Sequence, residues 1–118
     1  FRSKAYLTTH PNTDAAFTTA NLDAIGAAQG IAAAKMDGKV KLCGINFDEG
    51  ILNQIKSGKQ ACAIDQQGYQ QGFYAVSILN GYINYGLTIA TREILTGPGV
   101  VDSKTIDATM AGAKQGTR

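Results

Sequence analysis

Three stretches of polar side chains follow three predicted strands, at residues 18–21, 46–49 and 65–67. In open α/β sheets, ligands bind beyond the carboxyl ends of the strands. Asn and Gln side chains both donate and accept hydrogen bonds, and Asp accepts them strongly. These residue types suit the vicinal hydroxyls of a small neutral polar solute. The stretches contain no pair of nucleophile and base, so the sequence predicts no catalytic residue and a binding protein rather than an enzyme.

Four residues in these stretches are the candidate ligand-binding residues: Asn21, Asn46, Asp48 and Gln66. Each also has a simpler interpretation, because polar residues after a strand often form turns or cap helices. Helix capping is the alternative for Asn21 and Asp48, and a plain loop position is the alternative for Asn46 and Gln66. Three successive strands that end in such residues favour a binding site.

The single histidine and the two cysteines predict no further chemistry. Their spacing does not resemble a zinc site, and we expect neither a metal nor a cofactor. His10 precedes a proline and is expected at the surface. Cys43 and Cys62 are expected as small buried apolar residues in neighbouring strands. A disulfide would need Cα atoms within about 7 Å and suitable Cβ directions, which parallel neighbours rarely satisfy.

The elements that position these residues alternate along the chain. The patterns predict the end of a helix at 2–9, strands at 14–19, 41–47 and 60–65, helices at 22–36, 49–56 and 69–85, minor extended pieces at 92–95 and 100–101, a short helix from 104, and a frayed polar tail at 111–118. Strands that alternate with helices through short connections predict βαβ units and an open parallel sheet with flanking helices, the α/β class.

This predicted sheet is small and incomplete. The mostly apolar run at 41–47 is typical of a strand buried on both faces of a parallel sheet. Three good strands leave an open edge beside 14–19 or 60–65, and open edges invite pairing with another chain. The sequence therefore predicts a further βα unit upstream or a partner chain, which includes a homodimer formed through the open edge.

Composition excludes several broad classes. The 118 residues suit one domain, and 11 basic against 9 acidic residues give a net charge of +2, too weak and mixed for a nucleic-acid binder. With 44% hydrophobic and 17% charged residues, the chain is not disordered. No apolar run approaches the roughly 20 residues that span a bilayer. The chain opens at Phe1 without a methionine, which we interpret as a processing or proteolysis boundary.

Four segments in order resemble type I periplasmic sugar-binding proteins, in particular the ribose-binding branch. They are HPNTDAAFTTAN with AIGAA at 10–28, GINFD with IKSGK at 44–59, AIDQ with QG at 63–72, and LTGPGVVD at 95–102. The similarity covers nearly the whole chain, from Leu7 to about Asp107. Each motif is weak alone, but four in order with matching separations make a fairly specific match.

This resemblance implies the solute-binding component of an ABC importer. Such a protein has two lobes that close on a sugar, and residues 1–118 would be most of the C-terminal lobe, with the N-terminal lobe absent from this chain. The implied partners are a sugar, the missing lobe and the importer's membrane subunits, with no nucleic acid. The implied location is the periplasm, after export.

The resemblance also implies which side chains contact the sugar. Gln66 falls on the family's Gln, and Asn46 falls on its Asp. The family's Asn after the first strand aligns with Ala20, next to Asn21. Because Asn46 replaces a charged and stronger acceptor, the resemblance does not identify ribose as the ligand.

Two other functions share this kind of fold. The effector domain of a LacI-like repressor would carry its DNA-binding helices upstream. A flavodoxin-like enzyme would need a phosphate cradle or an acid–base pair, and the sequence shows neither. The ending at 97–102 and the preceding aromatic-rich helix favour the importer component. The aromatic residues of that helix are expected in the core or against another lobe, with the first of them near the ligand: Tyr69, Phe73, Tyr74, Tyr82 and Tyr85.

Overall fold

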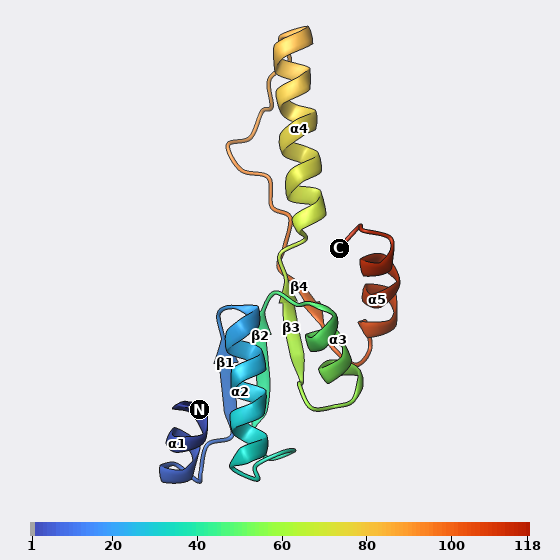
Figure 1. Cartoon of the computed structure of the whole chain (residues 1–118). Helices are drawn as coiled ribbons and strands as arrows, with labels where there is room; N and C mark the ends of the chain where they lie inside the picture. Colours follow the sequence, from blue (N-terminus) through green and yellow to red (C-terminus); the bar gives the residue numbers. More distant parts are fainter. Residues whose placement is uncertain (1) are drawn as a thin grey trace.

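Strands and helices alternate in the computed structural model, which describes residues 2–118 (Figure 1). In chain order the elements are α1 (Arg2–Thr9), β1 (Ala15–Thr18), α2 (Asn21–Ala33), β2 (Lys41–Ile45), α3 (Glu49–Lys56), β3 (Cys62–Asp65), α4 (Gly68–Tyr85), β4 (Gly99–Val101) and α5 (Ile106–Lys114). Each predicted helix and each of the three main strands is present. Of the two minor extended pieces, 100–101 lies in β4, whereas 92–95 forms no strand.

The four strands form one sheet in the order β1-β2-β3-β4. β1, β2 and β3 are parallel, which confirms the predicted α/β class, while β4 runs antiparallel to β3. The chain leaves β3 at its carboxyl end and returns there, so β4 must run back along its neighbour. β1 is an open edge strand, as predicted. The expectation of an open edge at β3 is wrong, because β4 pairs with it.

Helices cover one face of this sheet. Burial alternates along the strands: Leu42 and Ala63 are fully buried, whereas Phe17 on the other face is 60% exposed. The predicted burial of β2 on both faces is therefore wrong within the described residues.

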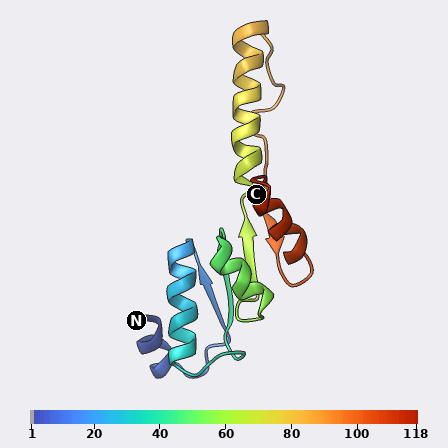
Figure 2. The ribbon, with the colours of Figure 1, turned by 45° about the vertical axis from the view of Figure 1, so that its right-hand side comes forward.

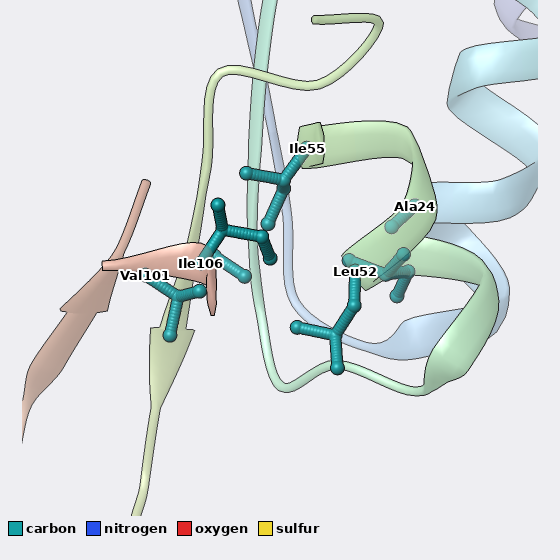
Figure 3. Close-up of a cluster of buried hydrophobic side chains, with 7 residues drawn as sticks. Ala24, Leu52, Ile55, Val101 and Ile106 are labelled. Atoms are coloured by element: carbon teal, nitrogen blue, oxygen red, sulfur yellow. The ribbon is translucent and has the colours of Figure 1, made fainter. Parts of the chain in front are cut away.

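The buried face carries two clusters of apolar side chains. One comprises Leu7, Ile31, Met36, Val40 and Leu42. The other, shown in Figure 3, comprises Ala24, Ile51, Leu52, Ile55, Ala63, Val101 and Ile106. Each member removes apolar surface from water, which is the main driving force for the fold. α3 contributes to the second cluster because Ile51, Leu52 and Ile55 lie on one side of it.

Cys43 and Cys62 form a disulfide bond, contrary to the expectation of two free thiols. The two residues are direct partners in the β2–β3 register, and their Cα atoms are 4.7 Å apart. Directly paired residues point their side chains to the same face of a sheet. The register, which the sequence alone did not reveal, therefore places both sulfur atoms together.

α4 and the segment that follows it project away from the sheet (Figures 1 and 2). We refer to residues 68–98 as the arm and to residues 2–67 and 99–118 as the body. None of the 18 residues of α4 is buried, and the molecule measures 60 × 27 × 20 Å. The arm turns back at Gly86, whose φ of 65° favours glycine. Among residues 2–118, no helix combines the length and apolar content that a bilayer crossing needs.

Candidate functional site

The parallel strands bring three candidate residues to the end of the sheet at which these strands have their carboxyl ends. Asn21 follows β1, Asn46 follows β2 and Gln66 follows β3. Parallel neighbours have their carboxyl ends at the same end of the sheet, so the residues that follow each strand lie there together. The side chains of Asn46 and Gln66 are exposed, and that of Asn21 is half-buried. Asp48 lies at the same end, where α3 begins.

Asp48 is the N-cap of α3, which confirms its capping interpretation. Its Oδ1 atom accepts a hydrogen bond from the Ile51 N–H at 2.9 Å. The bond satisfies one of the amide donors left unpaired at the start of a helix. Asp48 is nevertheless exposed, so its second carboxylate oxygen remains accessible at the edge.

Asn21 does not cap α2. The helix begins at Asn21, one residue before the expected start, and its N-cap is Ala20, which makes no side-chain bond. The capping interpretation of Asn21 is therefore wrong. The Thr19 hydroxyl instead donates to the Asp23 carboxylate at 3.3 Å across this first turn.

Asn46 continues the ladder between β2 and β3. Its N–H donates to the Ile64 carbonyl at 2.9 Å, and its backbone is left-handed with φ 66°. Asn tolerates this conformation better than most side chains do. The residue therefore ends the strand with a fixed backbone and an exposed amide.

Gln66 lies where the arm joins the body. Its carbonyl accepts hydrogen bonds from Gln71 Nε2 at 2.7 Å and from Thr96 Oγ1 at 3.2 Å. The backbone is thus held from both the outgoing and the returning side of the arm. Gln66 lines an open hollow together with Leu95 and Pro98.

Asp65 and Arg118 form an ion pair next to Gln66 that the sequence did not predict. Arg118 donates to Asp65 Oδ2 at 2.5 Å. The predicted frayed tail is wrong, because α5 continues to Lys114 and Thr117 donates back to Gly112. Asp65 belongs to the polar stretch 65–67 that the sequence singled out, but it was not among the four candidate residues. No local pattern marks Arg118, since its partner is distant in the sequence.

A second hollow opens between α3 and α5, with a volume of about 360 Å³. Its lining residues are Phe47, Asp48, Glu49, Leu52, Met110, Ala113, Lys114 and Arg118. Its lining combines two acidic and two basic side chains with apolar ones. Within residues 2–118, no group of three His, Cys, Asp or Glu side chains is arranged to hold a metal ion.

Comparison with protein families places this chain in a known group. The model of the periplasmic binding protein domain matches residues 2–87. The chain belongs to this family. The family is one of binding proteins, as the sequence predicted at this level. A comparison with curated protein sequences finds no significant match.

Solved structures of this family superpose closely on the chain. A carbohydrate transporter from Acidothermus cellulolyticus 11B, in complex with myo-inositol, is 33% identical with a TM-score of 0.85, over 99% of this chain and 41% of its own. A periplasmic ribose ABC transporter from Conexibacter woesei DSM 14684 is 30% identical with a TM-score of 0.80, over 98% of this chain and 39% of its own.

A third relative is an ABC transporter periplasmic solute binding protein from Actinobacillus succinogenes 130z with bound D-allose. It is 28% identical with a TM-score of 0.76, over 91% of this chain and 37% of its own. The chain therefore spans about 40% of the length of these solved relatives.

Proposed function

We propose that the chain is the C-terminal ligand-binding lobe of a two-lobed protein that binds a sugar and delivers it to an ABC importer. The observation that carries the proposal is the gathering of Asn21, Asn46 and Gln66 at one sheet edge in a periplasmic binding protein domain. Relatives of 33% and 28% identity hold myo-inositol and D-allose, both neutral polyhydroxy compounds. The proposed role is reversible binding without catalysis.

The arm supports the presence of a second lobe. Apolar side chains along α4 are exposed, among them Phe73, Leu79 and Ile83. Monomeric proteins rarely leave large contiguous apolar patches uncovered. The myo-inositol relative matches 99% of this chain with only 41% of its own length. A lobe that corresponds to its remaining residues would cover α4 in the complete protein.

The open edge at β1 supports a further pairing segment. Within residues 2–118, β1 pairs with β2 on one side only, so the backbone groups on its other side have no strand partner. A strand upstream in the complete protein would cover the edge, and a second copy of the chain is the alternative. Native mass spectrometry separates these arrangements by the mass of the species.

In the proposed mechanism, the two lobes close around the ligand by hinge motion. Closure is favoured only by contacts that the ligand makes in the closed state. The exposed amides of Asn46 and Gln66 would donate to and accept from sugar hydroxyls on this side. Since one lobe supplies about half of the contacts, the isolated chain is expected to bind sugars weakly.

The disulfide supports export of the protein. Disulfides form and persist in oxidising compartments such as the periplasm and are rare in the cytosol. The Cys43–Cys62 bond thus agrees with the proposed periplasmic location, where the importer component would capture its sugar.

Isothermal titration calorimetry of the two-lobed protein with myo-inositol, D-allose and D-ribose tests the proposal. Asn46→Ala and Gln66→Ala are each expected to weaken binding by about 1–3 kcal/mol, because sugar hydroxyls lose their partners. Asn53→Ala, which removes an exposed amide from α3, is the matched control. Full affinity in both site variants, or micromolar binding by the isolated 118-residue chain, would contradict the proposal.

A further inference from the structure

The Asp65 carboxylate is buried at the carboxyl end of β3, directly before Gln66. The residue is only 4% exposed. One oxygen accepts a hydrogen bond from the Gln67 N–H at 2.7 Å, and the other accepts from the Arg118 guanidinium. Replacing a buried ion pair by well-packed apolar residues is often neutral or stabilising. Stability alone therefore gives a weak reason for a carboxylate at this position.

The hydrogen bond to Gln67 closes a short turn around Gln66. Gln67 is left-handed, with φ 57° and ψ 54°, and it precedes α4 without a side-chain cap of its own. This conformation is unfavourable for a residue with a Cβ atom. An Asp side chain that accepts from the backbone two residues on stabilises such a turn. The bond thus sets the direction in which the chain passes through Gln66.

The carbonyl of Gln66 is fixed as well, by Gln71 and Thr96. With the residue before it buried and the residue after it hydrogen-bonded, Gln66 has little backbone freedom. Its exposed side chain remains free for a ligand. A binding residue held in place in advance loses less conformational entropy when the ligand binds.

We propose that Asp65 is a positioning residue for Gln66, acting through the hydrogen bond that its carboxylate accepts from the Gln67 N–H. The inference rests on the proposed function, in which Gln66 contacts the sugar. Asp65 itself shares the buried face of β3 with Ala63, and in this proposal it does not touch the ligand.

Two variants in the two-lobed protein separate the hydrogen bond from the ion pair. Asp65→Ala removes both and is expected to weaken sugar binding about tenfold, as expected for one buried hydrogen bond. Asp65→Asn keeps an acceptor for Gln67 and is expected to stay within about threefold of the unsubstituted protein. The matched control is Asp107→Asn, which removes the exposed Lys56–Asp107 ion pair and should leave affinity unchanged.

Hydrogen exchange at the Gln67 amide, measured by NMR without sugar, provides a readout that does not depend on binding. Exchange should be about tenfold faster in Asp65→Ala and near the original rate in Asp65→Asn. Unchanged exchange or unchanged affinity in Asp65→Ala would overturn the inference. If Asp65→Ala does not fold, loss of either protection or affinity in Asp65→Asn would overturn it. Absence of sugar binding by the unsubstituted protein would instead refute the proposed function, and the exchange rates would still test Asp65.

Discussion

α3 and α4 each follow a strand of the same sheet, yet they use their apolar side chains differently. α3 buries Ile51, Leu52 and Ile55 against the body within eight residues. α4 has 18 residues and buries none of them. In proteins, most helical stability comes from packing an apolar face rather than from helix propensity. The body therefore supplies its own packing, whereas the apolar side chains of the arm remain exposed within the described residues.

The contrast extends to how the two helices begin. α3 starts at a capping carboxylate, Asp48, whereas α4 starts at the left-handed Gln67 without a side-chain cap. The start of α4 is held from outside the helix, by Asp65 and by the returning Thr96. The start of α3 is thus fixed by its own capping residue, whereas the start of α4 is fixed by hydrogen bonds from residues outside the helix.

The largest difference between body and arm is expected for the same substitution made in each. Leu42→Ala, at a fully buried position, should destabilise the chain by about 2–5 kcal/mol through lost burial and the cavity left behind. Leu79→Ala, at a position 58% exposed on α4, should change it by about 0.5 kcal/mol or less. Urea unfolding of both variants measures the difference. Comparable losses in the free energy of unfolding would show that the arm is packed as tightly as the body.

Reduction of the disulfide should destabilise the body and leave the arm unaffected. The bond joins residues separated by 19 positions, and opening a loop of this size costs about 3 kcal/mol in the chain-entropy model. Thermal unfolding of Cys43→Ala/Cys62→Ala against the oxidised chain measures the loss. Thiol titration supplies the control, since the oxidised chain should show no reactive thiol. Equal unfolding temperatures would contradict the predicted role.

Removal of the α3 cap should have a smaller effect. Asp48→Ala is expected to cost about 1 kcal/mol, because the Ile51 N–H loses its acceptor. Asp48→Asn keeps a good capping side chain and serves as the control. Denaturant unfolding resolves the two variants. A loss in Asp48→Asn equal to that in Asp48→Ala would show that the negative charge, rather than the hydrogen bond, stabilises α3.

The smallest effect is expected at Asp102, in the turn between β4 and α5. The Lys104 N–H donates to this carboxylate and holds its pKa below the usual value, and the Thr105 N–H and hydroxyl act in the same direction. A carboxyl group with a lowered folded-state pKa stabilises the fold above its unfolded value of 3.8. That contribution is lost as the pH falls through the folded-state pKa.

An NMR titration of the Asp102 carboxyl carbon measures this shift. Thr105→Val removes the hydroxyl that donates to Asp102. In this variant the pKa of Asp102 should lie closer to the usual value than it does in the unsubstituted chain. A pKa at or above the usual value in the unsubstituted chain would contradict the assignment of these hydrogen bonds.

Features specified by neighbouring residues could be predicted from the sequence. The α3 boundaries and the Asp48 cap coincide with the prediction, because apolar spacing and a capping residue are both local signals. The alternation of strands and helices likewise predicted the parallel β1–β3 order. The gathering of Asn21, Asn46 and Gln66 at one edge followed from this order.

Features that depend on pairing between distant segments could not be predicted. The disulfide requires the register that sets Cys43 opposite Cys62, and the Arg118–Asp65 ion pair requires the end of α5 to fold back to β3. One-sided burial of the sheet was missed because an apolar run such as Lys41–Ile45 does not show how many faces the helices cover. The aromatic residues of α4 were predicted to lie in the core or against another lobe. The core alternative is wrong within residues 2–118, because no residue of α4 is buried.

The antiparallel pairing of β4 with β3 makes the arm an insertion. Asp65 pairs with Gly99, so the chain leaves the body for the arm and returns from it at the same end of the sheet. Antiparallel neighbours can be joined by a two-residue hairpin. The body's topology would survive replacement of the arm by a short turn, and insertions of different length at this point would leave the strand order intact. The arm is thus a module that evolution or protein engineering can exchange without redesigning the sheet beneath it.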